Sequence, residues 1–144
     1  MSLKLHVGVV PTTRHGYDYM EQLHGSPHQR RMIAEINQAF APALVVLDGV
    51  DAFVDGGPAS GKRAKGNMFL ASSDRVAIDA CGVAMLKLLG TNQAVMGRPI
   101  FDQEQIARAV ELGLGASSPA SIELIAGPES VALRDQVADV LKTG

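Results

Sequence analysis

The chain has 144 residues, which is enough for one domain, and 47% of them are hydrophobic, as in globular proteins. Thirteen Lys and Arg against fifteen Asp and Glu give a net charge of −2, which excludes the broad basic surface of a protein that mainly binds nucleic acid. The sequence has no apolar run long enough to span a membrane and no recognisable signal peptide, so we expect a cytoplasmic protein with no membrane partner.

The first 25 residues predict a strand and a long loop. Residues 1–3 look like a cloning scar, and we expect residues 4–144 to form a single α/β domain. LHVGVV at residues 5–10 predicts a short apolar strand, and residues 11–25, which have no clear period, predict a loop. Loops of that length are often functional.

A helix and a strand are predicted next. Ser26 and Gln29 form a capping-box pattern around Pro27, and apolar residues at helical spacing follow as far as Pro42. ALVVL at residues 43–47 is a continuous apolar run, which predicts a strand buried on both faces.

The middle of the chain predicts a glycine-rich loop at residues 55–67 and a strand at residues 68–71. Asp74 is placed to cap a helix that ends at Gly90, and Asp102 is placed to cap another.

The last predicted elements are a strand at residues 122–126 and a helix that opens at Pro128. Strands that alternate with helices predict an α/β fold with a mixed, partly parallel central sheet and helices packed on it. In such sheets ligands bind at the carboxyl ends of strands, and Asp48 follows a strand of this kind.

The loop after Asp55 resembles a phosphate-binding loop, because residues 56–62 read GGPASGK. Three features argue against a nucleotide site. Arg63 stands where a magnesium-binding hydroxyl is needed, Pro58 removes one amide donor, and the next segment predicts a strand rather than a helix. A weaker hypothesis is that the loop binds a small anion, and the alternative is a solvated turn. The residues of this candidate site are Gly56, Gly57, Gly61, Lys62 and Arg63.

Asp48 and Asp79 are the candidate catalytic residues. Asp79 lies in an apolar helix, where an ionised carboxylate needs a partner, and Arg75 is four residues earlier on the same face. We favour the interpretation of Asp79 as a structural lock that accepts loop amides or pairs with Arg75. The alternative is a metal or general-base site that Asp48 and Asp79 share.

Histidine and cysteine give weaker signals. His15, His24 and His28 match no strong metal motif, so we favour structural or surface roles for them, with His24 as the candidate metal ligand. Cys81, the only cysteine, predicts a core residue rather than a reactive thiol. One cysteine also cannot hold an iron–sulfur cluster, which usually needs about four thiolates.

The segment at residues 44–90 resembles the signature of the domain of unknown function 362 family. In that pattern Asp-Gly follows an apolar strand, Gly-Pro-x-x-Gly follows, and a second strand ends in Ala-Ser-x-Asp before Val-Ala-x-Asp-Ala. The matching positions are Asp48, Gly49, Gly57, Pro58, Gly61, Ala71, Ser72, Asp74, Val76, Ala77, Asp79 and Ala80.

The resemblance implies a fold rather than a reaction. Family domains are usually longer than this chain, so we expect it to be the C-terminal half of one. Many members carry ferredoxin-like cysteine clusters, which implies a cluster in a missing segment or in a ferredoxin-like partner domain. The first hypothesis is therefore a domain of a redox-linked protein that binds a small anion or a metal. The alternative is a non-catalytic interaction or homo-oligomerisation domain, and the sequence does not decide whether the protein is an enzyme.

Overall fold

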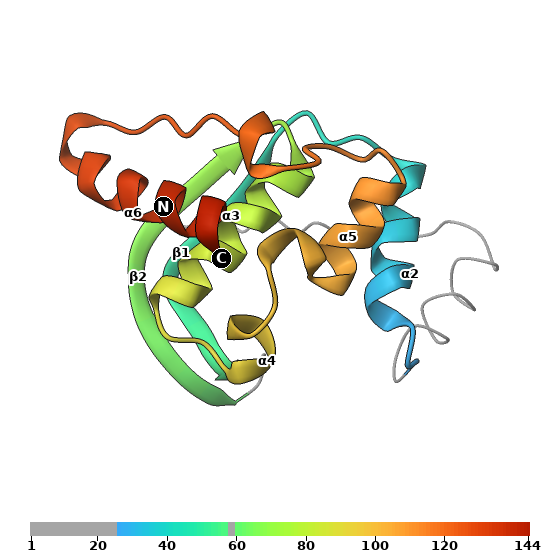
Figure 1. The fold of residues 1–144 in the computed structure, drawn as a ribbon, viewed down its shortest axis with the longest axis horizontal. Helices are drawn as coiled ribbons and strands as arrows, with labels where there is room; N and C mark the ends of the chain where they lie inside the picture. The colour runs from blue at the N-terminus through green and yellow to red at the C-terminus, as the bar shows by residue number, and fades with distance from the viewer. Residues whose placement is uncertain (1–25, 58–59) are drawn as a thin grey trace, which may run out of the picture.

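The computed structural model describes residues 26–57 and 60–144, which form a β-hairpin and a set of helices (Figure 1). Four 3₁₀ turns accompany them, at Asn37–Ala39, Ile100–Asp102, Pro119–Ser121 and Pro128–Ser130. The helices and strands are α2 (Gln29–Ile36), β1 (Val45–Gly56), β2 (Gly61–Ser72), α3 (Arg75–Leu88), α4 (Gln93–Met96), α5 (Glu104–Glu111) and α6 (Val131–Thr143).

The prediction of a mixed, partly parallel central sheet is wrong. The sheet formed by the described residues has two strands, β1 and β2, and they are antiparallel. β2 begins at Gly61 rather than at residue 68, so the chain turns directly from one strand into the next. A parallel pair would have needed a crossover of a dozen or more residues between the strands.

The sequence also predicts strands at residues 122–126 and 5–10. Residues 122–126 are not part of a sheet in the structure, although their side chains alternate between partly buried and exposed. The strand predicted at residues 5–10 lies outside the described residues. Within the described residues, the expected alternation of strands and helices therefore reduces to α2, one hairpin and the helices that follow it.

The hairpin turn explains the glycines of the presumed phosphate loop. Gly56 and Gly57 have φ angles of 71° and 91°, which non-glycine residues rarely adopt. The amide of Gly57 donates a hydrogen bond of 2.6 Å to the carbonyl of Ser60, which closes the turn. A β-carbon on Gly61 would meet the carbonyl oxygen of Asp55.

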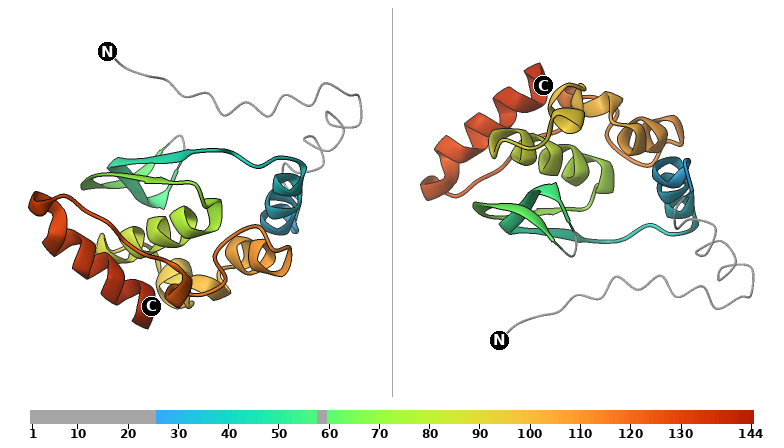
Figure 2. Two further views of the ribbon diagram at one scale, coloured as in Figure 1. Left: turned by 90° about the horizontal axis from the view of Figure 1, so that it is seen from above. Right: turned by 90° about the horizontal axis from the view of Figure 1, so that it is seen from below.

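The described helices cover only one face of the hairpin. Figure 2 shows α3 and α6 gathered on one side of β1 and β2. On the other side, Leu44 is 60% exposed, Val46 is 46% exposed and Phe69 is 66% exposed. The prediction that residues 43–47 are buried on both faces is therefore wrong, because the helices of residues 26–57 and 60–144 cover only the inner face of this sheet.

α3 is the central helix of the domain. As predicted, Asp74 caps it, and its carboxylate accepts hydrogen bonds from the amides of Val76 at 2.8 Å and Ala77 at 2.9 Å. The buried face of α3 packs against residues of the later helices and turns to form the main core. The core residues that α3 meets there are Ile100, Ile106, Val137 and Leu141.

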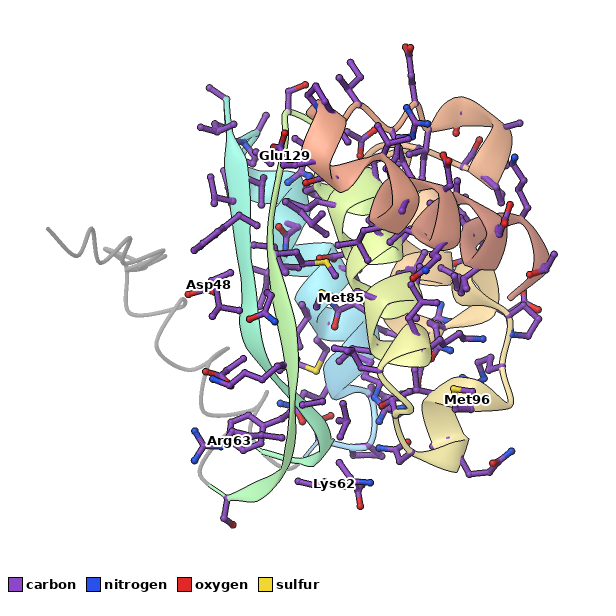
Figure 3. The ribbon with its side chains drawn as sticks, turned by 90° about the vertical axis from the view of Figure 1, so that its left-hand side faces the viewer. Asp48, Lys62, Arg63, Met85, Met96 and Glu129 are labelled. Carbon is purple, nitrogen blue, oxygen red and sulfur yellow. The ribbon has the colours of Figure 1, made fainter. Side chains whose placement is uncertain are left out.

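Three small or flexible residues let α3 approach the sheet closely. A β-carbon on Gly49 would press on the sulfur of Met85, and one on Gly66 would meet the carbonyl oxygen of Gly49. Met85 lies between the hairpin and the helices (Figure 3). A β-bulge follows Gly49, and β2 curves around α3 at this level (Figure 1).

Two helix starts differ from the prediction. α2 begins with His28 as its N-cap, and the Ser26 hydroxyl accepts a hydrogen bond from the His28 amide at 3.1 Å instead of capping the helix. α5 begins after Gln103, and Asp102 lies in the preceding 3₁₀ turn. Within the described ranges, no helix has the length and apolar character that a membrane span needs.

Candidate functional site

The structure places Asp48 and Asp79 on opposite sides of the sheet. Asp48 is exposed on the outer face of β1, where its carboxylate accepts a hydrogen bond of 3.0 Å from the amide of Val50. Figure 3 shows it on the far side of the hairpin from Met85, a residue of α3. Asp79 is on α3, which packs against the inner face. The two carboxylates therefore do not form a shared site.

The candidate anion-binding residues lie at the tip of the hairpin. Gly56, Gly57 and Gly61 shape the turn, and Lys62 is opposite Asp55 in the strand register. The guanidinium of Arg63 lies 5.5 Å from the centre of the Phe53 ring. A cation over an aromatic face is a stabilising contact in itself, so this geometry gives Arg63 a structural role.

The histidine hypothesis falls largely outside the structure. His15 and His24 lie outside the described residues, and His28 is exposed at the start of α2. Within residues 26–57 and 60–144, no three His, Cys, Asp or Glu side chains come together as a metal-binding group.

An open groove of about 600 Å³ lies beside α3, and we call it the α3 groove. α2, α4 and the start of α5 contribute the other walls. Such a concave, mostly apolar site with a few polar groups is typical of small-molecule binding. Its apolar lining includes Leu47, Val83, Met85, Leu86, Val95 and Ile106, and its charged lining consists of Arg30, Asp79, Arg98 and Glu104.

Asp79 lines the α3 groove and has no partner among the side chains that the structure describes. It is open to solvent through the mouth of the groove, and no hydrogen bond or ion pair joins its carboxylate to another described side chain. The surrounding protein partly desolvates the Asp79 carboxyl group, and this burial raises its pKa. An acceptor in this state is suited to bind a cation or a hydrogen-bond donor.

The expected pair between Arg75 and Asp79 does not form. The Arg75 guanidinium instead donates to the carbonyls of Asn37 and Phe40, the second at 2.6 Å, and to that of Leu114 at 3.4 Å. It also lies 5.7 Å from the centre of the Phe40 ring. A guanidinium group has five N–H donors in a rigid planar arrangement, so it can bond several backbone carbonyls at once. This explains why Arg75 binds the backbone instead of the Asp79 carboxylate.

The wall of the groove between α4 and α5 is held in place by two side chains. The ammonium of Lys87 donates to the carbonyl of Arg98 at 2.7 Å and to that of Met96 at 3.3 Å. The Gln103 amide donates to the carbonyls of Val95 and Arg98, each at 3.1 Å. The backbone that presents Arg98 to the groove is therefore fixed.

Sequence reasoning missed the other charged residues of the groove. Arg30 lies on α2, Arg98 follows α4 and Glu104 begins α5, and no motif links them in the sequence. Only the fold brings them to Asp79.

Cys81 is a core residue, as its surroundings in the sequence predicted. It is 5% exposed, and burial raises its pKa to about 11. Because the thiolate is the nucleophile, this raised pKa keeps Cys81 mostly in its less reactive thiol form at neutral pH.

Comparison with protein families identifies the class to which the chain belongs. The model of a domain of unknown function, DUF362, matches residues 1–84, which is more than half of the chain. The chain therefore belongs to the DUF362 family. Comparisons with curated proteins and with solved structures found no match. The matched residues include β1, β2 and Asp79, whereas the wall between α4 and α5 lies beyond them.

Proposed function

We infer that the chain binds a small organic molecule in the α3 groove, and that this molecule has an apolar body, a cationic or hydrogen-bond-donating group and an anionic group. The observation that carries this proposal is the Asp79 carboxylate, which has no partner among the described side chains and lies in an open groove of about 600 Å³.

Each part of the ligand corresponds to a part of the groove. The apolar side chains of Leu47, Val83 and Met85 give the ligand body a surface that excludes water. Asp79 accepts the donor group, and a charge-assisted hydrogen bond of this kind is among the stronger ones. Arg30 and Arg98 offer guanidinium groups to the anionic end of the ligand.

Arg30 and Arg98 support binding of a small anion, but in the α3 groove and not at the hairpin tip. The hypothesis of a metal draws no support from the donors in the groove, since Asp79 and Glu104 are its only carboxylates. The redox link, the ferredoxin-like partner and the assignment to a C-terminal half rest on the family resemblance alone.

A ligand panel tests this function. Leucine and phenylalanine carry both charges on an apolar body, and their amine and carboxylic-acid analogues carry one charge each. We expect the amino acids to raise the melting temperature more than the analogues, with inorganic phosphate and divalent metal ions having the smallest effect. A ligand at a hundred times its Kd stabilises the folded state by about 2.7 kcal/mol. Equal responses to all compounds, or none at millimolar concentration, would contradict the proposal.

The first prediction is that Asp79→Asn weakens ligand binding without destabilising the protein. Loss of a hydrogen bond to a charged group costs roughly 1.5–3 kcal/mol, so we expect about a 10- to 100-fold higher Kd by calorimetry. The raised pKa means that the ionised carboxylate disfavours the folded state as pH rises through the folded-state pKa. Asp79→Asn should therefore keep or increase the melting temperature at neutral pH and remove this part of its pH dependence.

Asp139→Asn is the matched control, since Asp139 is exposed on α6 and does not line the groove. It should change neither affinity nor stability. A large drop in the melting temperature of Asp79→Asn would instead support the structural-lock interpretation of Asp79.

Association with a second copy of the chain is a second candidate function. It is favoured by the outer face of the sheet, where Leu44, Val46 and Phe69 are exposed beside one another on β1 and β2 or just before them. Exposed apolar patches of this kind mark interaction sites, and a two-fold interface uses the same patch on both subunits.

We expect Phe69→Glu to weaken this association about tenfold or more, since burying a Phe side chain contributes about 1.5–3 kcal/mol. Light scattering after size-exclusion chromatography over a concentration series measures the effect. Met96→Glu is the control, because Met96 is also exposed but lies on α4, away from the outer face (Figure 3). A wild-type chain that stays monomeric at all concentrations would exclude this second function.

A further inference from the structure

The edge of β2 that no described strand pairs with borders a trough. Two cavities of about 330 Å³ each lie between residues 67–72 of β2 and the extended segment 121–127. They share Phe69, Leu70, Leu124 and Ile125, so they form one continuous trough along the strand. α3 and α6 supply its apolar floor, which consists of Ala77, Ile78, Cys81, Leu133 and Val137.

Both walls of the trough are extended backbone, and neither has a strand partner on that side among the described residues. β2 pairs only with β1 within the described sheet, and no backbone hydrogen bond joins β2 to residues 121–127. Side chains at 122–126 alternate between partly buried and exposed, which is the pattern of a strand. An added strand in the trough would find hydrogen-bonding groups on β2, as in strand addition to a sheet edge.

The occupant of the trough must be uncharged and apolar. The carboxylate of Asp74 is already bound to the amides of α3 and of Ala116, and Arg134 is paired with Asp135 at 2.7 Å. Glu123 is exposed. The remaining lining side chains carry no charge, so a charged strand would lose its hydration there without gaining a partner.

The chain contains one fitting segment outside the described residues. LHVGVV at residues 5–10 is as long as the β2 stretch that lines the trough, has no acidic or basic residue except His6, and has apolar residues at alternate positions 5, 7 and 9. Residues 11–25 could span about 50 Å when extended, and a domain of this length is about 40 Å across. Residues 5–10 also belong to the same family match as β1 and β2.

We propose that residues 5–10 bind in this trough as a third strand at the free edge of β2. The trough then becomes an internal docking site, and the hairpin becomes part of a sheet of at least three strands. Because the segment is tethered, its effective concentration at the trough is in the millimolar range without any further contact.

Disulfide trapping tests the proposal, because the native Cys81 lies on the floor of the trough. Single cysteines are placed at four consecutive positions of the full chain, as His6→Cys, Val7→Cys, Gly8→Cys and Val9→Cys. They are oxidised with copper phenanthroline at alkaline pH, where a larger share of Cys81 is thiolate. Side chains of a strand alternate between faces, and a disulfide needs Cα atoms within about 7 Å. We expect a disulfide within one chain at position 7, 9 or both, and none at 6 and 8.

The Cys81→Ser variant of each protein is the control and should abolish the product. A disulfide between two chains would show a second copy in the trough and overturn the proposal. Products at all four positions, or at none, would also overturn it. Hydrogen exchange of the unsubstituted chain is an independent readout, in which the amides of residues 5–10 should exchange at least tenfold more slowly than those of a free peptide. Free exchange there would contradict the proposal even if the cysteine variants failed to fold.

Discussion

Replacing Asp74 with Ala is expected to lower the free energy of unfolding by about 3 kcal/mol, or the melting temperature by about 10 °C. The carboxylate has two roles. It caps α3 through the amides of Val76 and Ala77, and it accepts a hydrogen bond of 2.7 Å from the amide of Ala116, which is 42 residues later. The substitution therefore frees amides at the start of the central helix and releases the segment that follows α5. Chemical denaturation measures the loss.

Asp74→Asn separates the two roles of Asp74. Asn caps helices about as well as Asp, but its single carbonyl oxygen cannot serve all three amides, so we expect an intermediate loss of about 1–2 kcal/mol. Gly115→Ala should also destabilise, since a β-carbon there would overlap the Asp74 carboxylate. A change below about 0.5 kcal/mol for Asp74→Ala, which is typical of surface substitutions, would show that this network is not important for folding.

Arg75→Ala is expected to cost about 2–3 kcal/mol, and Arg75→Lys should recover only a small part of it. The guanidinium joins the start of α3 to the carbonyls of Asn37 and Phe40 and packs over the Phe40 ring. A lysine ammonium lacks the planar fork and the stacking surface that these contacts use. We also expect faster hydrogen exchange in residues 29–40, because this segment loses its attachment to α3.

Arg134→Ala is the matched control for Arg75. Arg134 is also a helical arginine, but its bonded partner is its neighbour Asp135, an exposed residue. A surface pair of this kind contributes about 0–1 kcal/mol, so the control should be nearly neutral. If Arg75→Lys were as stable as the unsubstituted chain, the contacts to the carbonyls would contribute little.

The parts of the fold that depend on local signals could be predicted from the sequence. Asp74 as a cap and the end of the following helix before Gly90 are set by residues within one or two turns of each other. The capping box at Ser26 failed because the chain places His28 at the cap position, a shift of two residues. Helix boundaries are commonly uncertain by this amount.

The sheet could not be predicted in the same way. A continuous apolar run is typical of a strand that helices cover on both faces, yet Leu44 and Val46 are exposed on a face that the described helices leave open. The difference depends on packing between distant segments. Gly56, Gly57 and Gly61 are typical of a hairpin turn, but the same residues also match part of a phosphate-loop pattern, which favoured a ligand-binding interpretation.

Half of the candidate site could be predicted. Asp79 was identified because a carboxylate among apolar residues needs an explanation, and it does line the α3 groove. Asp48 follows the same strand pattern but points outward, because alternate residues of a strand face opposite sides. Arg30 and Arg98 could not be found, since their proximity to Asp79 is a property of the tertiary structure alone.

The two glycines beside the Met85 sulfur, Gly49 and Gly66, also allow a long hairpin to fit a much shorter helix. A straight strand of 12 residues would extend about 40 Å, whereas the 14-residue helix α3 is only about 21 Å long. Because Gly49 and Gly66 have no side chains, the hairpin can bend at its midpoint and curve around α3. A curved sheet of two strands can therefore cover one side of α3, whereas a flat sheet would need more strands to cover the same surface.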